Sequence, residues 1–410
     1  MTNGRPRIAI LGGGMAGLAA AWRLSEPGWC DRFDGITVYQ RGWRRGGKGA
    51  SRRGPHGRIE EHGLHLWLGF YENAFRLLRE CYAELDRPTT DPAAPIRTWR
   101  DALWPAAHIG IEDRHGDDWD HWLAVFTPND REPGEPLDDR GATTLAEYVR
   151  RALRLILDFV DALPSPRSTA PAGRVVLSAS AQPPSSPVGT LEAGARVVVP
   201  AALLEATRLV RLAIDRPDAA EAELTLVRAL DELQARLSAV VAADPALHRG
   251  WQHVSLSIAL VRGLVADGVL ADRRRLARLD DEDFLQWIAR HGAAPDAVDG
   301  AFLRGMYDLV LAYADGDPQR PGFSAGAAVL ITVKMLLEYK GALFWKMAAG
   351  MGDVVFAPLC QALRARGVDI EFFCRVDGLH LDARRHRIDA VSLGRQARLR
   401  TGVARYDPLV

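Results

Sequence analysis

Residues 7–18 decide the fold of the N-terminal region and read Arg7-Ile8-Ala9-Ile10-Leu11-Gly12-Gly13-Gly14-Met15-Ala16-Gly17-Leu18. The first five residues have the character of a short buried strand, and residues 15–24 have the apolar spacing of a helix. Between them, Gly12, Gly14 and Gly17 form the pattern G-x-G-x-x-G. In a strand–turn–helix context, these glycines permit the tight turn, the approach of a pyrophosphate to the backbone, and close packing of helix and strand. The stretch predicts a dinucleotide-binding turn in which the start of the helix, with Met15 and Ala16, faces the phosphates.

A second strand is expected at residues 35–40, GITVYQ, which is rich in β-branched and aromatic residues. The strand–helix–strand unit predicts parallel pairing through a right-handed crossover. The second strand of such a unit usually ends with Asp or Glu, which binds the ribose hydroxyls of a dinucleotide. This chain has Gln40 there, and a neutral acceptor forms a weaker hydrogen bond than a carboxylate. We therefore expect a weaker hold on the ribose.

A basic, glycine-rich loop, RGWRRGGKGAS, follows at residues 41–51. At this point the sequence resembles the amine oxidase and carotenoid desaturase group of FAD-dependent flavoproteins. In that group a Glu ends the second strand, and an Arg, a Gly-Gly-Arg/Lys triplet and a Ser or Thr follow at fixed spacings. Those spacings are met by Arg44, Gly46, Gly47, Lys48 and Ser51, with Gln40 as the mismatch. The resemblance implies that this loop, Arg41 included, contacts FAD. The alternative is that Arg41, Arg44 and Arg45 form a solvated patch of charge.

The segment Glu61-His62-Gly63-Leu64-His65 resembles the acidic-x-Gly-x-His motif of the desaturase branch, where the chain passes the flavin. The resemblance implies cofactor contacts for Gly63, Leu64 and His65, and it makes His65 a candidate catalytic residue. A metal site of His62 and His65 with neighbouring glutamates is the alternative. Because two histidines at this spacing without a third ligand rarely hold a metal, we predict no metal site.

The C-terminal region resembles the same group through residues 345–353, WKMAAGMGD, which precede a helix and a strand running from Val368 to Val376. In the group, a Val at the place of Val376 contacts the adenine through its backbone. The group's chain then returns for a further strand and a Gly-Asp motif that closes the flavin site. Here Tyr406 to Val410 stand where that return would begin. The sequence leaves open a fragment, a site completed by a second chain, or a loss of flavin binding.

The predicted fold class is α/β: a Rossmann-like FAD/NAD(P)-binding domain with an inserted, mainly helical substrate domain. Residues 1–75 and 341–410 are expected to form the cofactor domain, and residues 76–340 the insertion. Within the insertion, residues 165–200 are rich in Pro and Ser and predict a flexible surface segment. The acidic stretch at residues 112–121 predicts a solvated loop.

The composition excludes several classes of function. The 52 Lys and Arg residues equal the 52 Asp and Glu residues, so no net field attracts a nucleic acid backbone. The sequence has no apolar run long enough for a membrane span and no signal peptide, which predicts a cytoplasmic location. The four cysteines are scattered, as expected for buried, reduced thiols.

The expected function is that of an FAD-dependent oxidoreductase taking a hydride from a hydrophobic small molecule. Peripheral contact with a membrane is compatible with this prediction. Two alternatives stay open: a non-catalytic or half flavoprotein completed by another chain, and an NAD(P)-binding dehydrogenase, which leaves Gly46-Gly47-Lys48 unexplained. Several tryptophans line either a substrate cavity or the core, namely Trp67, Trp99, Trp104, Trp119 and Trp122.

Lysine is rare in this chain, because 48 of the 52 cationic residues are Arg. Related amine oxidases use a Lys near the flavin to hold a water, so Lys346, beside Trp345, is a second candidate catalytic residue. The alternative is that Lys334, Lys340 and Lys346 are all solvated.

Overall fold

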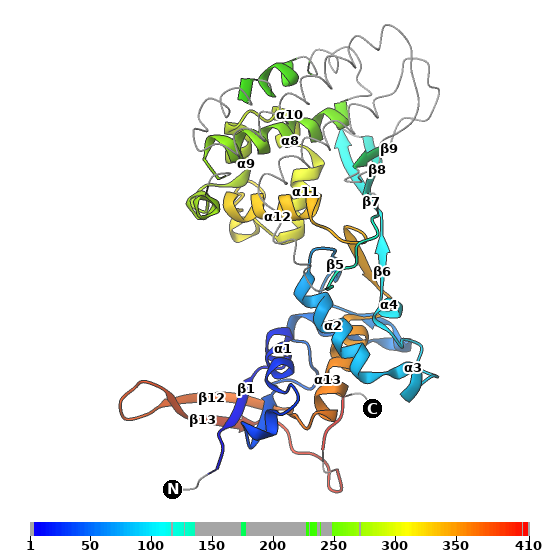
Figure 1. Cartoon of the computed structure of the whole chain (residues 1–410), viewed down its shortest axis with the longest axis vertical. Helices are drawn as coiled ribbons and strands as arrows, with labels where there is room; N and C mark the ends of the chain where they lie inside the picture. The colour runs from blue at the N-terminus through cyan, green and yellow to red at the C-terminus, as the bar shows by residue number, and fades with distance from the viewer. Residues whose placement is uncertain are drawn as a thin grey trace.

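The computed structural model describes residues 4–115, 118–126, 128–135, 174–177, 227–228, 230–235, 238, 248–269, 272–403 and 405–408. Most of the Pro- and Ser-rich segment expected at residues 165–200 lies outside the described residues. Figure 1 shows two lobes: a terminal lobe, which carries both chain ends, and a helical lobe above it. Among the described helices, none is long and apolar enough to cross a membrane.

A parallel sheet forms the centre of the terminal lobe. Strand β1 (Arg7–Leu11) leads through helix α1 (Met15–Leu24) to β2 (Gly35–Tyr39), and the two strands pair in parallel. Strand β11 (Asp369–Glu371) pairs in parallel with the other edge of β2, with Ile370 opposite Val38. The two ends of the chain therefore build one sheet, which confirms the predicted α/β, Rossmann-like fold class. Within the described residues, β1 pairs along one edge only.

Helices α2 (Glu72–Leu85) and α13 (Ala357–Ala365) pack together beside this sheet, and α13 follows a π-helical turn at Gly352–Phe356. The buried face of α2 includes Phe75, Leu78 and Tyr82, at helical spacing, because these residues meet the apolar face of α13. Ala102 and Leu103, which lie beyond α2 in the sequence, belong to the same core as Leu18 and Val38. The insertion was expected from residue 76, but α2 runs across that boundary.

A small antiparallel sheet connects the two lobes. Its order is β5 (Trp67–Leu68), β10 (Phe344–Met347) and β6 (Leu103–Ala106). Helix α3 (Arg87–Thr90) and helix α4 (Trp99–Ala102) precede β6, and Thr98 and Asp101 cap α4 reciprocally. The rings of Trp67 and Trp345 pack against Phe75 at 5.0 and 5.3 Å, so these tryptophans belong to the core, whereas Trp104 and Trp119 are exposed.

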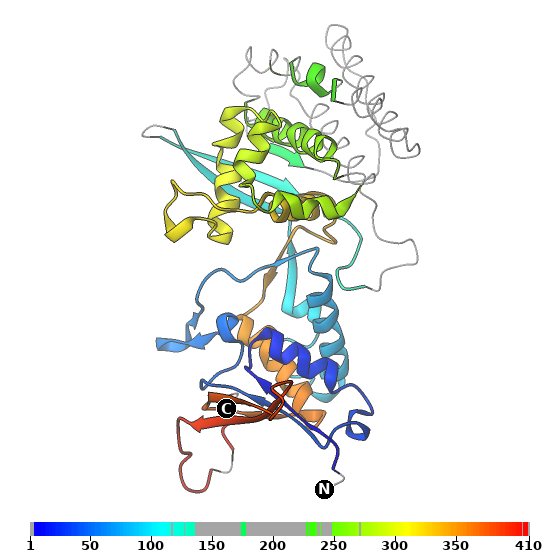
Figure 2. The same ribbon diagram turned by 90° about the vertical axis from the view of Figure 1, so that its left-hand side faces the viewer.

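The helical lobe (Figure 2) contains α8 (His248–Ala266), α9 (Phe284–Arg290), α10 (Pro295–Val298), α11 (Ala301–Val310) and α12 (Ala325–Leu337). Ile258, Trp287 and Tyr307 are fully buried at its centre. The side chains of Asp283 and Ser324 cap the N-termini of α9 and α12. Short 3-10 turns occur at Trp29–Asp31, Gly47–Gly49, Pro55–Gly57, Arg273–Leu279 and Ala314–Gly316.

The solvated loop expected at residues 112–121 is wrong. Residues His108–His115 and Asp118–Phe126 form antiparallel strands β7 and β8, and β9 (Arg174–Leu177) pairs in parallel with β8. In this register Ile111 lies opposite Trp122. The backbone of this acidic stretch therefore pairs as a hairpin, so a high content of charged residues does not by itself indicate a loop.

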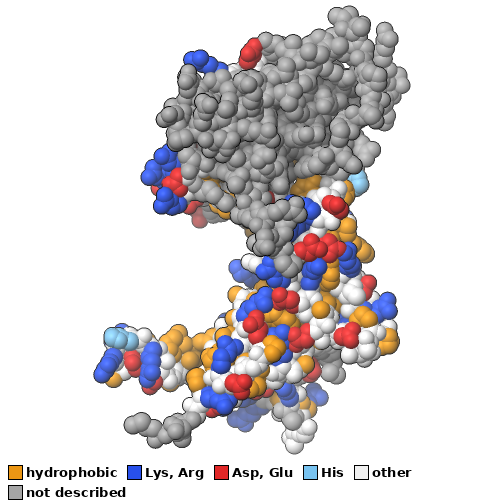
Figure 3. All heavy atoms as spheres, in the orientation of Figure 1, with side chains coloured by type: hydrophobic (Ala, Val, Ile, Leu, Met, Phe, Trp, Pro, Cys, Tyr) orange, Lys and Arg blue, Asp and Glu red, His pale blue; other side chains and the backbone are white. Residues whose placement is uncertain are grey.

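The strand expected from Val368 to Val376 is interrupted at Phe373, which has a φ of +60°. Strand β12 (Cys374–Leu381) starts after the break and forms a hairpin with β13 (Ile388–Arg395) that projects from the terminal lobe. Figure 3 shows hydrophobic side chains along this hairpin and a mixture of cationic, acidic and His side chains at its tip. Short strands β3 (Arg52–Arg53) and β4 (Ile59–Glu60) pair next to the glycine loop.

Candidate dinucleotide site

The turn between β1 and α1 has the geometry that its glycines predict. Gly12 has a φ of +118°, and its N–H donates to Tyr39 O at 2.9 Å. A Cβ on Gly17 would lie 1.9 Å from Gly12 O, so only glycine allows the helix to approach the turn. Gly14 is the N-cap of α1 and no side chain caps the helix, so the first N–H groups, at Met15 and Ala16, can bind an anion.

Gln40 is held at the end of β2 by both backbone and side chain. Its Oε1 accepts a hydrogen bond from Gly13 N at 2.9 Å. Its backbone N–H donates to Glu371 O, and its carbonyl accepts from Cys374 N. One of the two acceptor sites of the side-chain oxygen expected to meet a ribose is therefore used within the protein, which leaves its second acceptor site and the Nε2 amide to face a ligand.

The loop after Gln40 packs backbone to backbone against the first turn. Gly46 N donates to Gly13 O at 2.8 Å. A Cβ on Gly47 would lie 3.3 Å from Gly14 Cα, and a Cβ on Gly46 would lie 2.6 Å from the ring of Phe356. Both glycines also have positive φ angles. Glycine at these two positions therefore lets the two loops and the π-helical turn meet.

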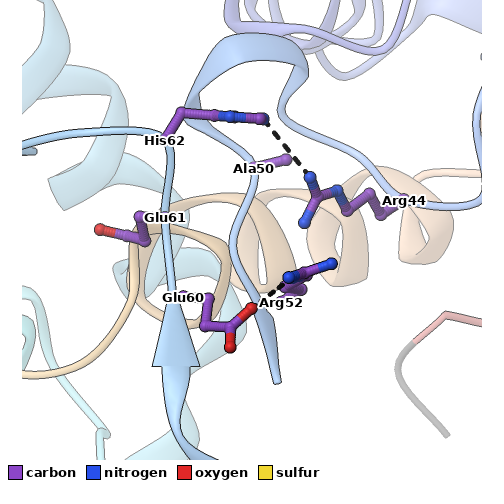
Figure 4. Close-up of a pocket in the computed structure, with 6 residues that line it drawn as sticks. All are labelled: Arg44, Ala50, Arg52, Glu60, Glu61 and His62. Carbon is purple, nitrogen blue, oxygen red and sulfur yellow. Dashed lines mark hydrogen bonds and ion pairs between the residues drawn. The ribbon is translucent and has the colours of Figure 1, made fainter. Parts of the chain in front are cut away.

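Beside this loop lies a cavity of about 270 Å³ (Figure 4), lined by Arg44, Ala50, Arg52, Glu60, Glu61 and His62. Arg44 points toward His62, with Nη2 and Nε2 3.5 Å apart. Arg52 Nε donates to Glu60 Oε2 at 2.5 Å. Glu60 therefore neutralises Arg52, whereas Arg44 faces the cavity as a cation without a carboxylate bonded to it among the described residues.

A set of hydrogen bonds around Glu61 joins distant parts of the chain. Glu61 Oε1 accepts from Ser51 Oγ at 2.5 Å and from Met351 N at 2.7 Å, and Oε2 lies 2.9 Å from His65 Nδ1. Gly352 N donates to Ser51 Oγ at 2.7 Å. Burial raises the pKa of the Glu61 carboxyl, but the hydrogen bonds from Ser51, His65 and Met351 outweigh it and lower that pKa. Glu61 therefore stays ionised and fixes the orientation of His65.

The other predicted cofactor residues lie in different surroundings. Arg41 and Lys48 are exposed on the glycine loop, and Leu64 is 74% exposed beside Gly63. Val376 lies on β12, two residues beyond Cys374, whose N–H bonds Gln40. The structure thus gathers Gln40, the glycine turns and the start of β12 at one end of the parallel sheet.

Lys346 belongs to the connecting sheet and not to a glycine loop. It is an exposed residue of β10 in the connecting sheet, opposite Trp104. The interpretation of all three later lysines as solvated is wrong for Lys340, which is 8% exposed and pairs with Glu72 at 3.0 Å. The solvated arginine patch is likewise wrong for Arg45, which is 6% exposed. Cys30 is exposed, contrary to the expected burial of all four thiols.

The sequence analysis did not predict that Ser51 and Glu61 connect the N-terminal and C-terminal segments through hydrogen bonds. It identified both residues only as parts of motifs. Met351 and Gly352, their partners, are some three hundred residues away, and no local pattern indicates that pairing. In the part of the chain that the structure describes, no group of three or more His, Cys, Asp or Glu side chains could hold a metal.

Comparison with known proteins matches residues 10–81 to a family described as the NAD(P)-binding Rossmann-like domain. The N-terminal region is a Rossmann-like dinucleotide-binding domain. Similar proteins are the zeta-carotene desaturases, chloroplastic/chromoplastic, of Solanum lycopersicum (38% identical over 81 residues), Capsicum annuum (35% over 78) and Arabidopsis thaliana (39% over 82).

Each of these matches covers 19% of this chain and only 12% or 13% of the relative. The resemblance of the Rossmann-like domain to the carotenoid desaturase and amine oxidase group is therefore confirmed for the N-terminal fifth of the chain.

Proposed function

We propose that the chain is an FAD-dependent oxidoreductase of the desaturase and amine oxidase kind, which takes a hydride from a hydrophobic small molecule. The observation that most supports FAD is the packing of Gly46 and Gly47 on Gly13 and Gly14. A nicotinamide dinucleotide bound by the first turn alone does not require this second loop. The similarity to zeta-carotene desaturases supports an oxidoreductase with a hydrophobic substrate.

The residues present fit FAD. The turn at Gly12 to Gly17 leaves no side chain between the backbone and a pyrophosphate, and the start of α1 offers N–H groups to it. Gln40 Nε2 would meet the ribose, Arg41, Arg44 and Lys48 would supply positive charge, and the backbone of Val376 would meet the adenine. Gly63, Leu64 and His65 would line the flavin side.

When bound, the flavin supplies the hydride acceptor. The protein residues orient the site: Glu61 holds His65 by Nδ1, so His65 presents its remaining ring nitrogen in a fixed direction. His65 would hold or transfer a proton at that nitrogen, and Lys346 would hold a water or a proton at Nζ. We also propose a cytoplasmic location with peripheral membrane contact during substrate collection, which cell fractionation would test.

The decisive experiment is to purify the full chain, incubate it with FAD, remove free FAD by gel filtration and record the flavin absorbance. A bound flavin that hydrophobic substrates reduce under anaerobic conditions supports the proposal. Tight retention of NADPH without any flavin would overturn it in favour of a dehydrogenase.

A second candidate function is a non-catalytic or half flavoprotein whose site another chain completes. Two observations favour it: the oxygen of Gln40 is already bonded to Gly13 N, and β1 has a free edge within the described residues. A colourless protein that takes up no FAD alone, but takes it up with a partner chain, would identify this case.

A further inference from the structure

One face of the β12–β13 hairpin consists of apolar side chains. Residues directly opposite each other in an antiparallel pair share a face, and so do residues two apart on one strand. A bulge in each strand, at Asp377 in β12 and at Asp389 in β13, restores the face where apolar residues are three apart. The pairs that lie on this face are Val376 with Leu393, Leu379 with Val391, and Leu381 with Ile388.

This apolar face is open to solvent. The four most exposed side chains on it are Val376, Leu379, Leu381 and Ile388, which are 40%, 51%, 47% and 51% exposed. Figure 3 shows the hydrophobic side chains along the hairpin, where it projects from the terminal lobe. Because contact between aliphatic groups and water is unfavourable, a continuous exposed apolar face indicates an interaction surface.

The same part of the chain carries a large excess of positive charge. Residues 374–405 contain eight Arg and three Asp, with no Lys or Glu, although the whole chain has a net charge of zero. Four of these arginines are exposed and have no ion pair among the described residues, namely Arg384, Arg385, Arg398 and Arg400. The apolar face therefore lies within a basic segment.

The tip of the hairpin is a preformed loop that carries two of the unpaired arginines. Asp382 N donates to Arg387 O at 3.0 Å, and Asp382 Oδ1 accepts from His386 N at 2.8 Å. Arg385 has a φ of +56°, a conformation in which Gly or Asn is the usual residue. The loop therefore presents its cations directly beyond the last apolar pair, without a cost for ordering the backbone on binding.

The size and charge of this surface fit a lipid surface better than a protein partner. Two strands of eight residues form a face of roughly 26 by 10 Å, far less than the about 800 Å² that each partner buries in a stable protein interface. A bilayer accepts a small element, because its apolar side chains enter the boundary of the acyl chains while its basic residues meet anionic headgroups.

We propose that the β12–β13 hairpin binds the surface of a membrane that contains anionic lipids. Its tip arginines lie at the headgroups, and its apolar face lies at the boundary of the acyl chains. This inference rests on the peripheral membrane contact of the proposed function and assigns that contact to one element. Its test uses neither FAD nor a substrate, so its failure and a failure to bind flavin are separate results.

The experiment sediments the full chain, without FAD, with two kinds of lipid vesicle. One kind contains phosphatidylcholine alone, and in the other about one third of the lipid is phosphatidylserine. We expect the chain to sediment with the phosphatidylserine vesicles and much less with phosphatidylcholine alone. Added salt should weaken the binding, because it screens the attraction between the arginines and the headgroups.

Two double variants test the two parts of the surface. Arg384→Gln with Arg385→Gln should weaken vesicle binding about tenfold or more, because each basic residue near an anionic surface raises the affinity several-fold. Leu381→Thr with Ile388→Thr should weaken it about tenfold as well, because less apolar surface enters the membrane. Thr is common in strands, so the hairpin should still form.

Matched controls change the same residue types in the helical lobe. Arg275→Gln with Arg278→Gln removes two exposed arginines from the 3-10 turn at Arg273–Leu279. Leu309→Thr with Val310→Thr changes two residues at the end of α11 that are 51% and 49% exposed. Both controls should bind vesicles like the parent chain. Circular dichroism checks the folding of every variant, and the arginine variant at the exposed tip keeps the test decisive if the apolar variant does not fold.

The proposal is overturned if the parent chain does not bind phosphatidylserine vesicles, or if either folded hairpin variant binds them as the parent does. It is also overturned if a control variant loses as much binding as the hairpin variants. Light scattering examines a second copy as the occupant. A dimer that Leu381→Thr with Ile388→Thr converts to a monomer, in a chain that does not bind vesicles, would assign the apolar face to that copy.

Discussion

Gly352 N donates a hydrogen bond of 2.7 Å to Ser51 Oγ across 301 positions of sequence. Together with the bond from Met351 N to Glu61, it connects the π-helical turn before α13 to the segment that follows Gly46, Gly47 and Lys48. The two terminal segments of the chain therefore share one hydrogen-bond network as well as one parallel sheet. Substitutions in this network should affect the whole terminal lobe.

Replacement of Glu61 by Gln should destabilise the chain by about 1–3 kcal/mol, because the hydrogen bonds from Ser51, His65 and Met351 lose their charged acceptor. The pKa of Glu61 is below its ordinary value of 4.5, so its stabilisation is complete above that pH and is lost as the pH falls through the folded pKa. The melting temperature of Glu61→Gln should therefore lie below that of the parent near neutral pH, and the two melting temperatures should become equal in acid. Glu60→Gln, which loses only a bond to exposed Arg52, is the control. A gap in melting temperature that stays constant with pH would contradict this account.

Gly17→Ala should lower stability by about 1–3 kcal/mol through overpacking, since its Cβ would lie 1.9 Å from Gly12 O. The same change should abolish dinucleotide binding by displacing α1 from the turn. Gly305→Ala on α11 meets nothing within 4 Å and should be neutral or raise stability by up to about 1 kcal/mol. Chemical denaturation compares the two, and equal effects would argue against the close packing at Gly17.

Gln40→Glu should strengthen FAD binding about tenfold at most. One carboxylate oxygen keeps the bond from Gly13 N while the other accepts a ribose hydroxyl with full charge. Fluorescence titration with FAD measures the change. Gln319→Glu, an exposed site in the helical lobe, controls for the added negative charge. Weaker binding in Gln40→Glu would show that the ribose does not lie at Gln40.

Lys346→Met should slow flavin reduction by substrate about a hundredfold if Lys346 transfers or holds a proton, with the FAD content unchanged. Stopped-flow reduction gives the rate, and absorbance gives the FAD content. Lys334→Met, which removes only the ion pair with Glu338, should reduce at the parental rate. Parental reduction and parental melting in Lys346→Met would identify Lys346 as a surface residue.

Glu72→Gln should lower the melting temperature, because it leaves the buried Lys340 without its carboxylate partner at 3.0 Å. The Gly134 N–H that also bonds Glu72 can still donate to the new amide oxygen, so the effect reports the lost charge. A loss of about 1–3 kcal/mol in the free energy of unfolding is expected. Lys340→Met in the Glu72→Gln background should recover part of that loss, and a further loss would contradict a charge-based cause.

The sequence by itself determined the Rossmann-like unit. Gly12, Gly14 and Gly17 lie in one short stretch between a strand and a helix. Glycine is required there because of local backbone geometry, which a sequence pattern can reveal. The Gly46-Gly47 pair could be predicted for the same reason, since both residues adopt positive φ angles. Charge content was a less reliable guide, since the acidic stretch at residues 112–121, predicted as a loop, lies in β7 and β8.

Only the tertiary structure decided how the side chains around that unit are used. It bonded Gln40 to Gly13 rather than leaving its oxygen free, and it buried Arg45 and Lys340 although both residue types are usually solvated. It also joined Ser51 and Glu61 to residues 351 and 352. Burial and long-range hydrogen bonds depend on which distant segments meet, and a local sequence pattern carries no information about that meeting.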